Sequence, residues 1–257
     1  MKNKIINTYL NGLLQAEVSK QEEDLDEILL VESQCWAENL RAEKEKFGIR
    51  QEKDALIIAR YIGKTEKILV SGKEKPVKNG QILGHLTAFP AKWTNAGVVH
   101  MLYNSGERKW ERIVQGFGLP KSWHEAALNG WLERDGISVV GDSDVVFLAS
   151  MCVAPDYRGS AGGSVIDSLL DSLKMHSKSR GALCIAGYTT LSGYRKFSGQ
   201  INMSADGYAL TNFGGKYISR SIDRHARNGA KIFCAIPKCM PEDLDSKGFG
   251  ALVVYKL

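Results

Sequence analysis

The residues best suited to chemistry lie in the stretch MCVAPDYRGSAGGSVIDSLL, residues 151–170. An apolar run stops at Pro155, a glycine-rich turn from Arg158 to Gly163 follows, and an amphipathic pattern begins after the turn. Small residues let backbone N–H groups approach an anion, and the start of a helix adds unpaired amides and a positive dipole end. Arg158 adds a charged donor. The stretch favours a pyrophosphate-binding turn; the alternative is a turn needed only for chain geometry.

The spacing of the turn excludes two common nucleotide motifs. A P-loop requires G-x-x-x-x-G-K-[ST] and a dinucleotide fingerprint requires G-x-G-x-x-G, and neither occurs here. The five cysteines include no C-x-x-C pair, and the five histidines have no metal-ligand spacing. We therefore expect reduced thiols, no metal and a cytoplasmic location.

Composition narrows the class of ligand. The chain has 257 residues, of which 44% are hydrophobic and 25% charged, as in ordinary globular proteins. The net charge of +5 is uneven, because residues 174–257 hold 13 Lys and Arg against 5 Asp and Glu. A basic second half suits an anionic ligand or partner. The charges are dispersed, so we expect no nucleic acid, and no apolar run is long enough for a membrane span.

The elements that must position the turn follow from hydrophobic periodicity. Residues 1–19 and 24–47 have the period of amphipathic helices, and 72–80 has the composition of a turn. Further helices are expected at 162–179 and 219–229. A short helix or turn is expected at 192–199, and two short helices within the tryptophan-rich segment 104–143. Strands are expected at 55–63, 67–72, 81–89, 97–103, 144–155, 182–190, 230–237 and 249–257. This alternation indicates a mixed α/β chain, with an N-terminal helical extension over 1–23 and one domain over 24–257.

The pattern R-x-x-[GA]-x-G, after a strand ending V-x-P, resembles the coenzyme A-binding motif of the GNAT acyltransferase superfamily. The resemblance implies an α/β (α+β) fold with a mixed, mostly antiparallel central sheet, flanked by helices and with splayed central strands. It implies an acyl-CoA substrate, acetyl-CoA or malonyl-CoA, whose pantetheine pairs with the strand near Cys152 and Val153. It also implies a pyrophosphate held by Arg158, Gly159, Ser160, Ala161, Gly162, Gly163 and Ser164. Ala161 stands where glycine is commonest in the motif.

Four further motifs, in order along the chain, resemble the GNAT-like domains of polyketide synthase loading modules. They are Cys35-Trp36-x-x-x-Leu40, Gly187-Tyr188-Thr189, His225 before ARNGAKI, and PEDLDSKGFGALVVY from Pro241. The resemblance implies His225 and Thr189 as a catalytic pair and Trp36 in the acyl pocket. The alternatives are a helix-surface histidine, a strand threonine and a core tryptophan.

Two positions qualify this resemblance. Tyr194 follows the second splayed strand, where many superfamily members place an acidic tyrosine, but the spacing is one residue longer than usual. Met240 stands where the loading domains have an arginine before P-E-D, so a substrate carboxylate or phosphate lacks that partner.

Three functions remain open from the sequence. The first is acyl transfer, acetyl transfer above all, to an amine or a carrier thiol. The second is decarboxylation of a malonyl or methylmalonyl thioester, as in polyketide chain initiation, with a separate acyl carrier protein as partner. The third is a module that binds CoA or an acyl carrier without chemistry.

Overall fold

The computed structural model describes residues 13–64, 66–70, 73–91, 122–123, 145–158 and 160–257. The chain divides into two compact units. The first comprises residues 1–89 and 149–179, and the second comprises residues 90–148 and 180–257. Strand β6 (Val145–Val153) begins in the second unit and ends in the first.

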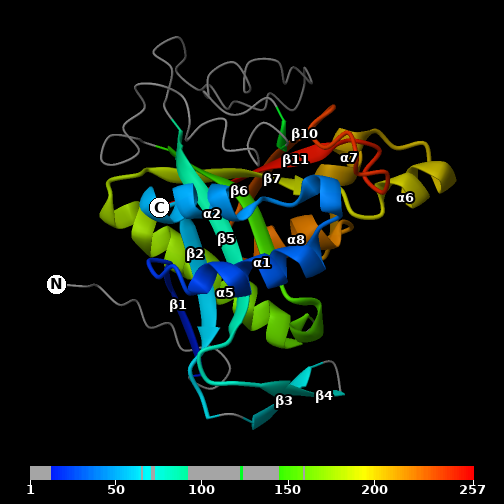
Figure 1. Cartoon of the computed structure of the whole chain (residues 1–257). Helices are drawn as coiled ribbons and strands as arrows, with labels where there is room; N and C mark the ends of the chain where they lie inside the picture. Colours follow the sequence, from blue (N-terminus) through cyan, green and yellow to red (C-terminus); the bar gives the residue numbers. More distant parts are fainter. Residues whose placement is uncertain (1–12, 65, 71–72, 92–121, 124–144, 159) are drawn as a thin grey trace. The chain divides into compact units, whose positions relative to one another are not determined.

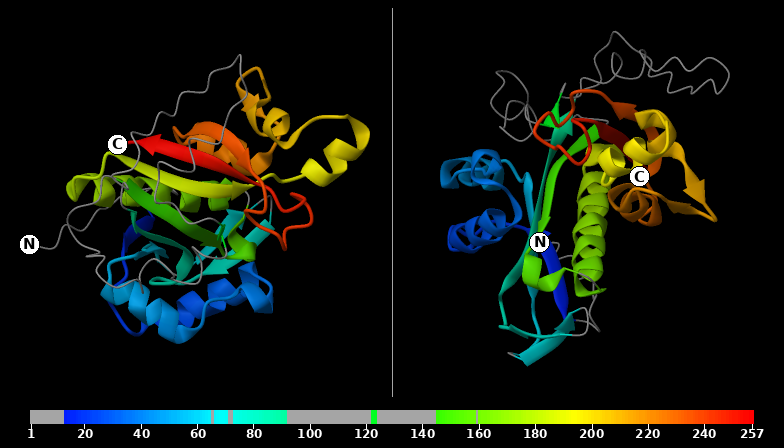
Figure 2. Two further views of the ribbon diagram at one scale, coloured as in Figure 1. Left: turned by 90° about the horizontal axis from the view of Figure 1, so that it is seen from above. Right: turned by 90° about the vertical axis from the view of Figure 1, so that its right-hand side faces the viewer.

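The first unit is a sheet with helices on both faces. Its strand order is β1 (Leu14–Val18), β2 (Leu56–Tyr61), β5 (Ile82–Ala91) and the end of β6. Helices α1 (Asp24–Cys35) and α2 (Lys44–Glu52) cover one face and α5 (Ser160–Ser179) covers the other (Figures 1 and 2). The remaining elements are the short helices η1 (Glu38–Leu40) and η2 (Pro155–Tyr157) and the hairpin of β3 (Glu66–Val70) with β4 (Lys73–Val77).

Gly84 on β5 allows the close approach that sets the end of β6. A Cβ at this position would lie 2.6 Å from the Cys152 carbonyl oxygen and 2.9 Å from Val165 Cγ1. Neither contact is possible for a methyl group, so only glycine lets β5, β6 and α5 pack this tightly. The packing places the end of β6 against the start of α5.

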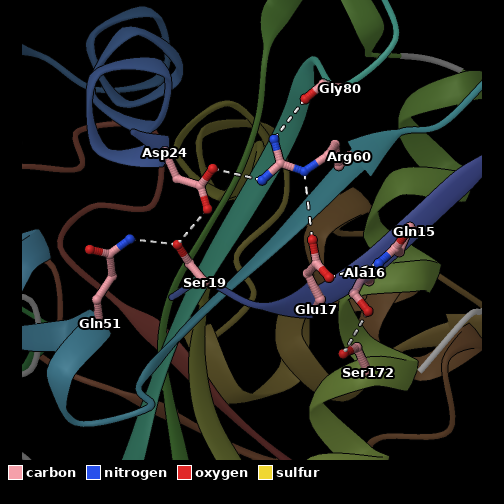
Figure 3. A network of polar contacts seen from close by, with 9 residues as sticks. All are labelled: Gln15, Ala16, Glu17, Ser19, Asp24, Gln51, Arg60, Gly80 and Ser172. Atoms are coloured by element: carbon pink, nitrogen blue, oxygen red, sulfur yellow. Dashed lines mark hydrogen bonds and ion pairs between the residues drawn. The ribbon is translucent and has the colours of Figure 1, made fainter. Parts of the chain in front are cut away.

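Arg60 on β2 ties helix α1 to the sheet through a buried polar network (Figure 3). Its guanidinium contacts Asp24 Oδ1 at 2.7 Å, donates to the Gly80 carbonyl at 2.8 Å and lies 3.6 Å from Glu17. Ser19 donates to the other Asp24 oxygen at 3.0 Å. The network fixes the first turn of α1, and the last turn of that helix carries Cys35.

The second unit is also built on a sheet, with the order β6, β7 (Cys184–Thr190), β11 (Gly250–Lys256) and β10 (Lys231–Ile236). β6 and β7 pair in parallel, and the paired stretch ends at Leu148 and Gly187, before either strand ends. The other pairs are antiparallel. The unit also contains α6 (Tyr194–Gln200), α7 (Ala205–Leu210), β8 (Asn212–Phe213), β9 (Lys216–Tyr217) and α8 (Arg220–Arg227).

The predicted fold class is confirmed: the sheet is mixed, mostly antiparallel and flanked by helices. Three local predictions are wrong. Residues 14–18, expected in a helix, pair with β2, and residues 73–77, expected in a turn, form β4. The helix expected over 24–47 ends at Cys35, because Trp36 takes an extended conformation.

Some predictions lie outside the described residues. These are residues 1–12, the strand expected at 97–103 and most of the tryptophan-rich segment. No helix in the described ranges has the length and hydropathy needed to cross a membrane.

Candidate functional site

The glycine-rich turn leads directly into the first turn of α5. After η2, the backbone enters a helix at Ser160 that continues for 20 residues. A helix of this length leaves its first amides without helical partners and carries a positive dipole end. Ser160, Ala161, Gly162, Gly163 and Ser164 belong to this first part of the helix, while Gly159 lies outside the described residues. A long helix therefore begins where the predicted anion site requires one, and the site itself stays a prediction.

Arg158 stands at the entrance to this helix. Its Nε donates to the Val153 carbonyl at 3.0 Å, and the side chain is exposed. A guanidinium has five N–H donors in a planar fork, so four remain after this bond. The strand end thus holds the cation beside the first turn of α5, where a phosphate would need it.

A pocket of about 250 Å³ opens at the end of β6, within the first unit. Cys35 ends α1, and Trp36 follows it in an extended conformation. The chain therefore turns away from the helix axis just where the two side chains reach the pocket. The lining residues are Cys35, Trp36, Met151, Cys152, Val153, Arg158 and Ile166.

A buried polar cluster adjoins the pocket through Cys152. The Cys152 thiol donates to Glu32 Oε2 at 3.5 Å, and His85 Nε2 lies 3.2 Å from the same oxygen. The His85 contact lacks hydrogen-bond alignment. One ligand atom of each of these three side chains lies within 4.8 Å of the others, a donor set that could accept a divalent ion. Arg50 already offsets the carboxylate charge, so we interpret the cluster as an internal network.

The Glu32 carboxylate keeps its charge despite its burial. Burial raises its pKa, but the contact with His85, the Ala42 N–H and the charge of Arg50 outweigh that effect. The net pKa therefore lies below its ordinary value. A charged carboxylate therefore lies next to the Cys152 thiol.

The pKa values of the two cysteines in the pocket are shifted in opposite directions. A hydrogen bond from Cys152 and the nearby Arg158 lower the pKa of Cys35 to about 7, against the effect of burial. Burial, with the neighbouring Cys35 and Glu32, strongly raises the pKa of Cys152. Cys35 also lies 3.3 Å from the Val153 carbonyl, which its thiol form can donate to. Near neutral pH, Cys152 is a thiol and Cys35 is partly a thiolate.

Thr189 and His225 belong to the second unit, on one face of its sheet. Thr189 is paired with Ala251 on β11, and Ala251 packs against Ile222 of α8. His225, one turn further along α8, has its Nδ1 2.6 Å from the hydroxyl of Tyr255. Thr189 thus lies on β7 beside Ala251, and His225 lies on α8 against Tyr255, four residues further along β11. In the described chain no hydrogen bond joins them.

His225 is buried, and burial lowers its pKa to about 4. The helix-surface alternative is therefore wrong for this residue. The ring is neutral at neutral pH, with one nitrogen engaged by Tyr255. A neutral imidazole can donate a hydrogen bond to a developing oxyanion, but it is a poor proton donor.

Tyr194 and Met240 are also buried, in the second unit. The Tyr194 hydroxyl donates to the Met203 carbonyl at 3.2 Å, and its ring packs against Tyr208 and Phe249. Burial raises the pKa of Tyr194. Tyr194 thus packs among aromatic residues, and its acid role stays a prediction. Met240 is buried in the loop before β11.

The structure therefore brings together four of the residues predicted from the sequence: Trp36, Cys152, Val153 and Arg158. Sequence reasoning missed Cys35 as a site residue, together with Glu32 and His85. The C-W motif marked Cys35 only as a neighbour of Trp36. The contacts that give Cys35 its properties join residues more than 100 positions apart, which no local pattern reveals.

Comparison with known proteins supports the fold assignment. No protein-family model matches the chain, and no curated protein matches it. Among solved structures, the loading GNATL domain of CurA from Lyngbya majuscula matches with a TM-score of 0.62 and 18% identity, over 95% of this chain and 97% of that one. The GphF GNAT-like decarboxylase, in complex with isobutyryl-CoA, matches with a TM-score of 0.56 and 18% identity, over 95% and 98%. The chain has the GNAT fold shared by these two structures.

Proposed function

We propose that this protein is an enzyme that binds an acyl-CoA at the pocket of the first unit and transfers the acyl group to an amine or a carrier thiol. The observation that carries the proposal is the pocket itself, which lies beside the glycine-rich start of α5 and is lined by Trp36, Cys152, Val153 and Arg158. The start of α5 and Arg158 would hold the pyrophosphate. Pantetheine would follow the end of β6, and the acyl group would meet Trp36.

The pocket residues would act mainly by orientation and by exclusion of water. A thioester held against β6 presents its carbonyl to backbone amides, which stabilise the charge that develops on the oxygen. An acceptor that enters the pocket then attacks within one site, where proximity supplies much of the rate. Three protein groups, Trp36, Met151 and Ile166, give the pocket apolar walls.

Decarboxylation of a malonyl thioester is the second candidate, and one observation favours it. The fold match to a GNAT-like decarboxylase covers nearly all of both chains. In this candidate Thr189 and His225 stabilise the enolate oxygen, which suits a neutral His225. Met240 cannot replace the relatives' arginine, so we rank this function below acyl transfer.

Product analysis separates the candidates. The protein is incubated with acetyl-CoA or malonyl-CoA, with and without an added amine or carrier thiol, and the products are followed by mass. We expect repeated turnover, with more than one free CoA released per protein, only when an acceptor is present. Acetyl-CoA formed from malonyl-CoA, and abolished by His225→Ala, would instead establish decarboxylation. CoA binding without either product would establish a binding module, and an absence of CoA binding would overturn the assignment of the turn.

A further inference from the structure

Cys35 differs from the other thiols of this chain whose protonation is shifted. Burial raises the pKa of Cys152, Cys234 and Cys239, whereas that of Cys35 falls to about 7. Cys35 is also half-buried rather than enclosed, and it lines the pocket beside Trp36. It therefore combines access from the pocket with a reactive protonation state.

The geometry around Cys35 is that of a supported nucleophile. Its sulfur lies 3.3 Å from the Val153 carbonyl, the strand end beside which the thioester would lie. Arg158 contacts the same carbonyl oxygen at 3.0 Å, so a cation stands next to the sulfur. Cys152, which stays protonated, can donate to a Cys35 thiolate. When Cys35 is itself a thiol, Cys152 can donate to Glu32 instead, at 3.5 Å.

The groups behind Cys152 hold this arrangement in place. Glu32 is buried and accepts from the Ala42 N–H at 3.2 Å, and His85, fully buried, faces the same carboxylate. Neither ring nitrogen of His85 has a hydrogen bond within the described residues. A buried imidazole left without directed partners costs stability, which suits a functional cluster better than an optimised core.

We propose that the Cys35 thiolate accepts the acyl group from the bound acyl-CoA, so that an acyl-cysteine thioester forms in the pocket before the group reaches its final acceptor. This step rests on the proposed binding of acyl-CoA. The Cys35 sulfur forms a bond to the acyl carbon, and the bond from that carbon to the CoA sulfur breaks. The electron pair leaves on CoA as a thiolate, which takes a proton from solvent. One thioester replaces another, so no oxidant or further reactant is needed.

The test is the mass of the intact protein after incubation with acetyl-CoA, malonyl-CoA or isobutyryl-CoA without an acceptor, quenched in acid. We expect a mass increase of one acyl group with at least one of the three. Peptide mapping should place it on Cys35, and hydroxylamine should remove it. Cys35→Ser should lose the adduct and at least 90% of the transfer rate, yet bind CoA with unchanged affinity. Cys184→Ser, a half-exposed thiol on β7, should behave as the unaltered protein.

A second measurement covers the case in which Cys35→Ser fails to fold. Iodoacetamide should alkylate Cys35 of the unaltered protein with a midpoint near pH 7 and abolish acylation. In Cys152→Ala the midpoint should rise toward the ordinary thiol value of about 8.5. An adduct on another residue, or transfer that persists after alkylation of Cys35, would overturn the inference. CoA binding without acylation by any of the three thioesters would also overturn it and leave the CoA site standing.

Discussion

Cys35 and Cys152 show how strongly single residues depend on their neighbours. They lie in one pocket, yet Cys152 is enclosed beside the Glu32 carboxylate, whereas Cys35 is partly open and next to Arg158. A neighbouring anion favours the neutral thiol and a neighbouring cation favours the thiolate. The same side-chain type therefore supplies a proton donor at one position and a nucleophile at the other.

The burial of His225 predicts how the free energy of unfolding depends on pH. Burial lowers its pKa from 6.5 to about 4 in the folded protein. Above pH 6.5 the ring is neutral in both states, so it adds no pH dependence. As the pH is lowered from 6.5 to 4, the unfolded chain takes up a proton that the folded protein does not. The free energy of unfolding therefore decreases over this range. The loss reaches about 3 kcal/mol at pH 4.

Urea unfolding at pH 7, 6, 5 and 4 measures this loss. His225→Gln cannot titrate but keeps a polar group for Tyr255. The variant should lose less stability than the unaltered protein, and the difference should grow only below pH 6.5. Parallel stability curves for the two proteins would show that His225 is not buried as a neutral ring.

At the scale of elements, the break after α1 builds the pocket. Trp36 leaves the helix in an extended conformation, and Arg41 Nε donates to its carbonyl at 2.8 Å. The break also places Ala42 so that its N–H donates to the Glu32 carboxylate. One continuous helix over 24–47 would carry these side chains away from the end of β6.

The packing of β5 against β6 gives a second prediction. Gly84→Ala would place a methyl 2.6 Å from the Cys152 carbonyl, so strand β6 must move. We expect a loss of about 2 kcal/mol in unfolding free energy and weaker CoA binding. Gly48, in α2, is the control, because nothing lies within 4 Å of its added Cβ. Gly48→Ala should stabilise the protein by up to about 1 kcal/mol. Equal effects of the two variants in urea unfolding would contradict the close approach.

The Arg60 network gives a third prediction. Arg60 and Asp24 are 18% and 6% exposed, so removal of Arg60 leaves Asp24 buried without its ion pair. Arg60→Ala should cost about 3 kcal/mol in unfolding free energy. The exposed pair of Lys67 and Glu74 is the control, and Lys67→Ala should cost less than about 0.5 kcal/mol. A double-mutant cycle should show Arg60→Ala and Asp24→Ala to be less than additive; additivity would contradict the direct coupling.

At the scale of the whole molecule, the sequence predicts the continuous apolar strands well and the two strands of mixed composition, β1 and β4, poorly. β2, β5, β6, β7, β10 and β11 are apolar runs, and each lies within a predicted range or extends it by a residue or two. β4 is KEKPV, mostly exposed, so its composition indicates a turn although it pairs with β3. β1 is LQAEV, whose short apolar pattern fits a helix period as well as a strand. Pairing with β2 decides between them.

The candidate site is predictable only in part, for a related reason. Arg158 and the glycines that follow are one local motif, so an anion site can be predicted from the sequence. The properties of Cys35 depend on Cys152, Arg158 and Glu32, which come from separate parts of the chain. Such a cluster exists only once the sheet has formed, and the sequence pattern contains no trace of it.

A calorimetric titration with CoA tests the central claim most directly. We expect one CoA per chain in the pocket beside α5, and at least about tenfold weaker binding for Arg158→Gln, because a charged contact to phosphate is lost. Lys67→Gln removes the same charge from the exposed β3 hairpin and should change the affinity less than about twofold. No binding by the unaltered protein, or equal binding by Arg158→Gln, would contradict the account.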